Sequence, residues 1–116
     1  MKVDVRSLGF TMTEAMRAQV MEGLGRALRR RRQAVRRVEV RLSDINGPRG
    51  GVDKRCTLRV RMHGRSLIAV TRDDADLYAA IAQAVDVAAL RYEAVLRRDH
   101  PRRHPGRMPS PQTSPR

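Results

Sequence analysis

Apolar and polar residues alternate along four short stretches of the chain, which is the spacing of half-buried β-strands. These stretches cover residues 2–6, 37–43, 56–62 and 66–72. In the first three, every second residue is Val, Leu, Cys or Met. The segment 63–65, His-Gly-Arg, favours a tight turn between the last two stretches. The pattern therefore predicts four strands, the last three of which follow one another directly.

Two other stretches carry apolar residues at helical spacing. The first begins at Thr13, whose hydroxyl can cap a helix, and runs to about residue 32. The second is predicted to be capped by Asp73 or Asp74. The apolar stripes are Met16, Val20, Leu24, Ala27 and Leu28 in the first helix, and Leu77, Ile81, Val85, Ala88, Tyr92 and Val95 in the second.

The elements follow one another as β-α-β-β-β-α, which indicates an α+β fold. An antiparallel four-stranded sheet with two helices packed on one face would bury all the apolar stripes in a single core. The α-β-β-β-α part of this order is shared with double-stranded-RNA-binding domains (dsRBDs), so the expected fold is dsRBD-like. On this arrangement Arg37, Arg41, Arg59 and Arg61 lie on the open face of the sheet.

We expect one domain over residues 1–99 and a disordered Pro- and Arg-rich tail over residues 100–116. Five of the six prolines lie in the last 16 residues, where Met108 is the one apolar side chain apart from proline. Such a segment buries too little surface to offset the entropy lost on ordering.

Composition excludes several classes of protein. Aromatic residues make up only 3% of the 116 residues, so the core must be aliphatic. The single cysteine, Cys56, forms no internal disulfide, and we expect it to be buried and inert. No apolar run approaches the roughly 18 residues of a membrane span, and Asp4 and Arg6 interrupt any signal-peptide core. We expect a cytoplasmic protein without membrane, metal, cofactor or small-molecule substrate.

Charge gives the clearest indication of a partner. The formal net charge is +13, and all basic residues except Lys2 and Lys54 are arginines. The planar guanidinium binds phosphate oxygens in pairs, so this composition favours a polyanion such as a nucleic acid. The candidate RNA-binding residues are Arg26, Arg29, Arg30, Arg31, Arg32, Arg36, Arg37, Arg49, Lys54, Arg55, Arg59, Arg61, Arg91, Arg97 and Arg98.

The other candidate motifs and residues have simpler structural explanations. The glycine-rich segment 46–51 lacks the Gly-Lys-Ser/Thr ending of a phosphate-binding P-loop, so it is a flexible connection or a tip that presents arginine. Tyr78 and Tyr92 could stack on bases, although both lie near an apolar stripe and are expected to pack at the core or its rim. No nucleophile–base pair or metal constellation is visible, so we do not expect an enzyme.

Several residues, taken in order, carry a resemblance to a known family. These are Thr13-Glu14-Ala15 at the first helix start, Asp44 at the second strand end, the stretch 46–56, and Asp76-Leu77-Tyr78-Ala79-Ala80-Ile81 followed by Asp86. Together with the element order, over about residues 1–98, they resemble the ribosome hibernation-promoting factor and ribosome-associated inhibitor family, also called ribosomal-subunit interface proteins. The stretch 46–56 is similar to a divergent bacterial branch.

The resemblance implies a short family member, without the C-terminal domain through which long members pair ribosomes. It implies binding to small-subunit rRNA near the mRNA channel and tRNA sites, and inhibition of translation under stress or in stationary phase. The chain departs from the family at its last helix, where Val87, Leu90 and Ala94 replace basic residues. Residues 74–100 carry a net charge of −2.

Three functional hypotheses follow. The first is a non-catalytic ribosome-associated translation inhibitor. The second is a protein–protein interaction or regulatory module that keeps the fold but not the rRNA site, and whose apolar last helix supports a weak homodimer. The third is a generic double-stranded-RNA binder, which would bind any RNA duplex with similar affinity.

Overall fold

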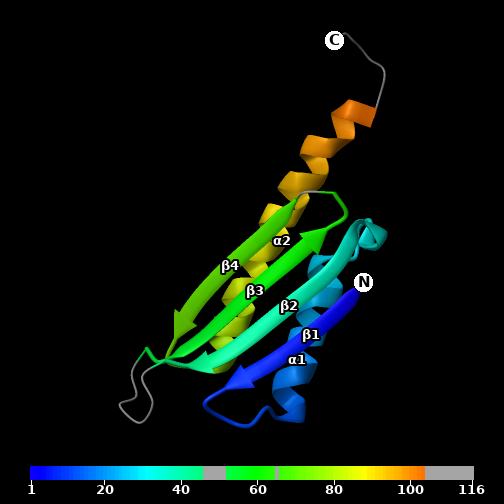
Figure 1. The fold of residues 1–116 in the computed structure, drawn as a ribbon. Coiled ribbons are helices and arrows are strands. Elements are labelled where there is room, and N and C mark those ends of the chain that lie inside the picture. The colour runs from blue at the N-terminus through cyan, green and yellow to red at the C-terminus, as the bar shows by residue number, and fades with distance from the viewer. Residues whose placement is uncertain (46–51, 65, 104–116) are drawn as a thin grey trace.

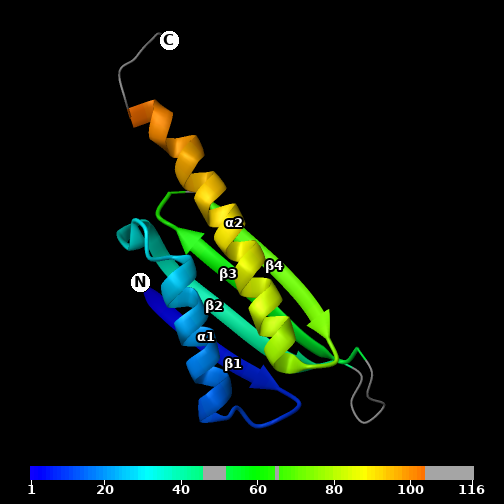
Figure 2. The same cartoon turned by 180° about the vertical axis from the view of Figure 1, so that it is seen from behind.

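A computed structural model describes residues 1–45, 52–64 and 66–103, and the elements follow the predicted order (Figure 1). They are β1 (Lys2–Leu8), α1 (Glu14–Ala27), the short 3₁₀ helix η1 (Arg32–Ala34), β2 (Val35–Asp44), β3 (Lys54–Met62), β4 (Leu67–Asp74) and α2 (Leu77–Arg103). The four strands form one sheet, and both helices pack on the same face of it (Figure 2).

The sheet is mixed, which corrects the expectation of a wholly antiparallel one. Its strand order is β1-β2-β3-β4, and the two later pairs are antiparallel. However, β1 pairs with β2 in parallel, with Val3 opposite Val38 and Val5 opposite Val40. The reason lies in the connection, because α1 carries the chain back along the sheet before β2 begins, and neighbouring strands joined by such a crossover run in the same direction. The alternation of apolar and polar residues is the same in parallel and antiparallel strands, so it does not predict the direction of β1.

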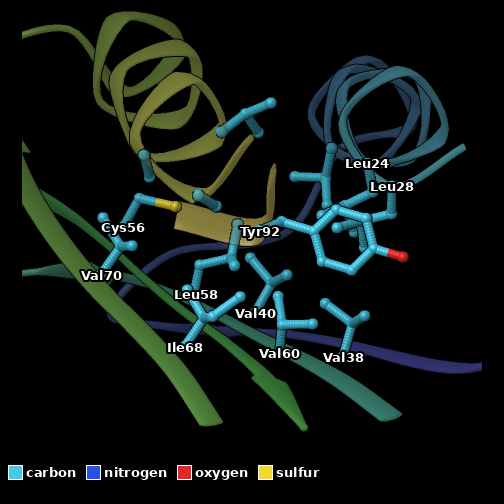
Figure 3. Close-up of a cluster of buried hydrophobic side chains, with 14 of the residues drawn as sticks. Leu24, Leu28, Val38, Val40, Cys56, Leu58, Val60, Ile68, Val70 and Tyr92 are labelled. Carbon is cyan, nitrogen blue, oxygen red and sulfur yellow. The ribbon is translucent and has the colours of Figure 1, made fainter. Parts of the chain in front are cut away.

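The core lies between the sheet and the two helices. The predicted stripe of α2 is confirmed, since each of its six residues is at most 7% exposed. From the sheet, rows such as Val38, Val60 and Ile68 face the helices. Tyr92 is fully buried among these aliphatic side chains, and its ring reaches from α2 toward Leu24 and Leu28 (Figure 3).

Helix α1 begins as predicted but ends earlier. The Thr13 hydroxyl accepts a hydrogen bond of 3.1 Å from the Met16 amide, which is the expected N-cap. The helix ends at Ala27 rather than near residue 32. Leu28 is the last core residue before the turn, and Arg31 then adopts a left-handed conformation with φ of 52°. The chain must turn there to enter β2, so the arginine run forms a turn and not a helix end.

The start of α2 also differs from the prediction. Asp73 and Asp74 are the last residues of β4, because Asp73 pairs across the sheet with Arg55. Asp76 directly precedes the helix, and its carboxylate accepts a hydrogen bond of 3.0 Å from the Tyr78 amide. The capping role therefore belongs to Asp76.

Two glycines have a visible structural role. A Cβ atom added to Gly23 would lie 3.1 Å from Val85 Cγ2, so this glycine lets α1 approach α2 closely. Gly64 has φ of +92° in the predicted turn between β3 and β4. The predicted turn residue Arg65 and the glycine-rich segment 46–51 lie outside the described residues.

Helix α2 continues to Arg103, past the domain limit expected at residue 99. The rest of the predicted tail, residues 104–116, lies outside the described residues, so the tail stays a prediction. Among the described helices, none combines the length and apolar character that crossing a membrane requires.

Candidate nucleic-acid interface

The open face of the sheet presents rows of charged side chains. One row places Lys2 of β1 opposite Arg37 of β2, which is in turn opposite Arg61 of β3. A second row is mixed, with Glu39 between Asp4 and Arg59, and a third places Arg6 opposite Arg41. These residues alternate with the buried valines and leucines, so the predicted open-face position of the four arginines agrees with the register.

Two hollows adjoin on this face. One, of about 360 Å³, lies over the middle of β1, β2 and β3, and the other, of about 480 Å³, lies over their end. Arg37 and Glu39 line both hollows, which makes them continuous. We call their basic residues the sheet-face track. It consists of Lys2, Arg6, Arg36, Arg37, Arg41, Arg59 and Arg61.

The track contains more positive charge than its own carboxylates balance. Arg61 Nε lies 3.1 Å from Glu39 Oε1, and Arg6 Nη2 lies 3.5 Å from Asp4 Oδ2. Within the described residues, Arg37, Arg41 and Arg59 form no ion pair or side-chain hydrogen bond. Arg41 and Arg59 are also exposed. These guanidinium groups are available to an anion from outside the protein.

Two other predicted residues of β3 are engaged with protein carboxylates. Arg55 binds Asp73 through two hydrogen bonds, of 2.8 and 3.0 Å. This contact raises the pKa of Arg55 and lowers the pKa of Asp73. Lys54 Nζ lies 2.8 Å from Asp53 Oδ2, and the hydrogen bond to that carboxylate raises the pKa of Lys54. Arg55 and Lys54 are therefore the weaker candidates for RNA contact.

The arginine turn, residues 28–32, is fixed against α2. Arg30 forms an ion pair with Glu93, and Arg32 Nη2 donates to the carbonyl oxygen of Gly25 at 3.3 Å, near the end of α1. The Tyr92 hydroxyl lies 2.6 Å from the Arg30 carbonyl oxygen and donates to it. Burial raises the pKa of Tyr92, so the hydroxyl keeps its proton for this bond. The turn is thus ordered by contacts that are remote in sequence.

The structure separates the predicted RNA-binding residues into several places. Arg36, Arg37, Arg59 and Arg61 meet on the sheet-face track, whereas Arg26 and Arg29 are exposed at the end of α1 and just after it. Arg91 donates to the Ala69 carbonyl oxygen at 2.6 Å, at β4. Arg97 and Arg98 are exposed in the second half of α2. The end of this helix projects beyond the sheet (Figure 1). Arg49 lies outside the described residues.

Three residues of the track, Lys2, Arg6 and Arg41, are absent from the predicted RNA-binding set. The signal was present, because Lys2 and Arg6 alternate with Val3 and Val5 along β1, and Arg41 alternates with Val40 and Leu42 along β2. The pattern does not say which strand pairs with β1. Parallel pairing with β2 brings Lys2 and Arg6 beside the arginines of the central strands.

The remaining candidate residues lie outside the sheet-face track. Cys56 is buried as expected, and desolvation raises the pKa of its thiol to about 12. Tyr92 packs in the core, and Tyr78 is partly exposed at the start of α2. In residues 1–45, 52–64 and 66–103, no group of three or more His, Cys, Asp and Glu side chains could hold a metal ion.

Comparison with known proteins gives a consistent result. Residues 3–100 match the family model described as Sigma 54 modulation protein / S30EA ribosomal protein. The Protein Y N-terminal domain of Thermus thermophilus is similar, with a TM-score of 0.68 and 29% identity over 82% of this chain and 99% of that one. A ribosomal subunit interface protein from Coxiella burnetii has the same fold, with a TM-score of 0.63 and 18% identity over 86% and 98% of the two chains. No curated protein matches the chain.

Proposed function

The chain belongs to the Sigma 54 modulation protein / S30EA ribosomal protein family, and we propose that it acts as a hibernation factor. In this role it binds small-subunit rRNA near the mRNA channel and the tRNA sites and inhibits translation under stress or in stationary phase. The site of action is the cytoplasm, where ribosomes are. No catalytic step is part of the proposal.

The sheet-face track is the observation that carries the proposal. Arg37 and Arg41 are four residues apart on β2, a separation of about 14 Å at the usual rise of a strand. Arg59 lies on the neighbouring strand, opposite Glu39. Unpaired guanidinium groups spread over this distance suit the successive phosphates of a nucleic-acid backbone, because each phosphate accepts hydrogen bonds from a guanidinium in pairs.

The first half of α2 has no basic residue, which favours the open face of the sheet as the RNA-binding surface. Between Leu77 and Leu90 the helix has no basic residue, and its solvent side includes Asp86. A carboxylate there repels a phosphate backbone. We therefore place the main rRNA contact on the open face of the sheet, with Arg97 and Arg98 near the end of α2 as secondary contacts.

A second candidate function is a protein–protein interaction module. The observation in its favour is Leu90, which is 73% exposed on α2. Val87 lies one turn earlier and is half-buried. A weak homodimer through this helix would cover both side chains. The generic duplex binder is the third candidate, and it differs from the first only in selectivity.

Sedimentation through sucrose separates these functions. The proposal predicts that the purified chain travels with isolated small subunits and with whole ribosomes, and that a several-fold excess of an unrelated RNA duplex does not displace it. Displacement in proportion to added duplex would favour the generic binder. A dimer by light scattering, with no ribosome-bound fraction at low salt, would favour the interaction module and overturn the proposal.

A further inference from the structure

A third, smaller hollow lies away from the sheet-face track. It measures about 170 Å³ and is lined by Arg31, Gln33, Met62, His63, Ser66 and Leu96. The lining residues come from the segment before β2, from the end of β3 and the residue before β4, and from α2. In the ribbon views, the start of β2, the end of β3 and the start of β4 lie at the same end of the sheet (Figures 1 and 2). It shares no lining residue with the hollows of the open face.

Backbone hydrogen bonds hold the walls of this cleft together. The Ala34 amide donates to the Arg31 carbonyl oxygen at 2.8 Å, and the His63 amide donates to the Ala34 carbonyl oxygen at 2.9 Å. The Met62 amide donates to the Ser66 carbonyl oxygen at 3.1 Å, which closes the β3–β4 turn. The Tyr92 hydroxyl adds a contact of 2.9 Å to the Arg31 carbonyl oxygen. The cleft is thus built in advance of any ligand.

Arg31 is the unusual residue of the cleft. Among the described residues it is the one non-glycine residue with positive φ, a conformation that disfavours a side chain with a Cβ atom. Arg31 is a half-buried residue, and its guanidinium forms no ion pair or hydrogen bond within the described residues. Arg30 and Arg32 on either side each have a partner. The turn therefore keeps an arginine in a strained conformation at the cleft and leaves its charge unbalanced.

The other lining residues define the chemistry of a ligand. Met62 and Leu96 are each 4% exposed and form an apolar floor. The amide of Gln33 and the hydroxyl of Ser66 each offer a donor and an acceptor, and the imidazole of His63 adds a further polar group. A fitting ligand combines one anionic group, a flat apolar body and a polar edge. The volume is well below the roughly 300–1,000 Å³ of a drug-sized pocket, which limits the part of the ligand that enters the cleft to one small unit.

We propose that this cleft binds one unpaired nucleotide of an RNA strand. The phosphate contacts Arg31 and His63, the base lies on the Met62–Leu96 floor, and the edge of the base meets Gln33 and Ser66. A paired base is unavailable for such contacts, so the cleft selects single-stranded RNA. The sheet-face track, in contrast, contacts the backbone alone. That the polymer is RNA rests on the proposed function, whereas the nucleotide chemistry rests on the cleft.

The test uses the full chain and three probes, which are a single-stranded RNA hexanucleotide, an RNA duplex and inorganic phosphate. We expect the hexanucleotide to shift the NMR signals of the His63 imidazole and the Gln33 side-chain amide. Arg31→Gly should weaken hexanucleotide binding at least fivefold, since it removes the guanidinium while glycine accepts positive φ without strain. Arg72→Ala removes the same charge from an exposed residue outside the cleft and should change binding less than twofold.

Three results would overturn the proposal. One is equal hexanucleotide affinity for Arg31→Gly and Arg72→Ala. Another is an equal shift of the His63 and Gln33 signals by duplex and hexanucleotide. The last is the full shift with inorganic phosphate alone, which would reduce the cleft to an anion site. Sedimentation with ribosomes is scored separately, so a chain that binds the hexanucleotide but no ribosome contradicts the proposed function and leaves the cleft intact.

Discussion

The Tyr92 hydroxyl lies 2.6 Å from the carbonyl oxygen of Arg30, a residue 62 positions earlier in the chain. Tyr92 is 0% exposed, so this contact joins the centre of the core to the arginine turn. The carbonyl groups of Arg30 and Arg31 lie beyond the end of α1, and that of Arg31 also accepts the Ala34 amide at the start of η1. The Tyr92 hydroxyl contacts both carbonyl oxygens, and α2 thereby orders a segment whose own sequence is almost entirely charged.

Replacing Tyr92 with Phe should destabilise the protein by about 1 kcal/mol, because the Arg30 carbonyl oxygen loses its side-chain donor and the Arg31 carbonyl oxygen keeps only the Ala34 amide, while the ring still fills the core. Urea unfolding measures this difference. Tyr78→Phe is the matched control, since Tyr78 is 38% exposed, and it should stay within about 0.5 kcal/mol of the parent chain. Equal stability of the two variants would show that the phenol does not support the turn.

The two glycines of α1 should respond to alanine in opposite directions. A Cβ atom at Gly25 meets nothing within 4 Å, so Gly25→Ala should stabilise the protein by up to about 1 kcal/mol through helix propensity. At Gly23 the new atom would press on Val85, which is buried, so Gly23→Ala should destabilise it by about 1 kcal/mol. Thermal unfolding of both variants measures whether Gly25→Ala is more stable, and Gly23→Ala less stable, than the parent chain. Stabilisation by both would mean that the helices can separate without cost.

The Arg55–Asp73 pair should give stability a dependence on acid pH. The guanidinium hydrogen bonds lower the pKa of Asp73, so the folded state binds this proton less readily than the unfolded state does. The stabilisation is therefore present above the usual aspartate pKa, near 4, and is lost as the pH falls through the lowered folded value. Asp73→Asn should be less stable than the parent at pH 7, and the gap should close toward pH 2.5.

Asp86→Asn is the control for this titration, because Asp86 is exposed and forms no ion pair within the described residues. Melting temperatures measured from pH 7 to 2.5 should run parallel for Asp86→Asn and the parent chain. A constant gap between Asp73→Asn and the parent over the same range would show that the pair adds no pH-dependent stability.

Cys56 should resist alkylation while the protein is folded. Its thiol is 0% exposed and has a pKa of about 12, so very little thiolate is present at pH 8. Labelling by iodoacetamide should follow the global unfolding rate and accelerate with added urea. Rapid labelling without denaturant would indicate local opening of β3 next to the helices.

Periodicity was enough to predict the elements whose burial depends on it. The α2 stripe from Leu77 to Val95 and the alternating residues of β2 and β3 occupy the core as expected, because helical and strand spacing leave one face for apolar residues. The direction of β1 was not accessible in this way. Side chains alternate identically in parallel and antiparallel strands, and only the crossover through α1 makes β1 parallel to β2.

The errors at helix ends have a different cause. Arginine is a good helix former, so nothing local ends α1 at Ala27, and the chain turns there because Leu28 fills the core and Tyr92 binds the following carbonyl groups. Likewise, a run of aspartates offers several possible caps, and only the cross-strand pair with Arg55 assigns Asp73 to β4. The positive charge of the candidate site could be predicted from the composition. The location of the site could not, because it depends on the sheet register and on these tertiary contacts.

The central claim is that the sheet-face track holds the RNA backbone, and it is tested by the salt dependence of binding to isolated small subunits. Arg41→Ala/Arg59→Ala and Arg17→Ala/Arg72→Ala each remove two exposed arginines, the first pair from the track and the second pair from outside it. If the track holds the RNA backbone, the first variant lowers the slope of log affinity against log salt by about two units, and the second leaves it nearly unchanged. Equal slopes for the two variants would contradict a role of the track in binding the RNA backbone.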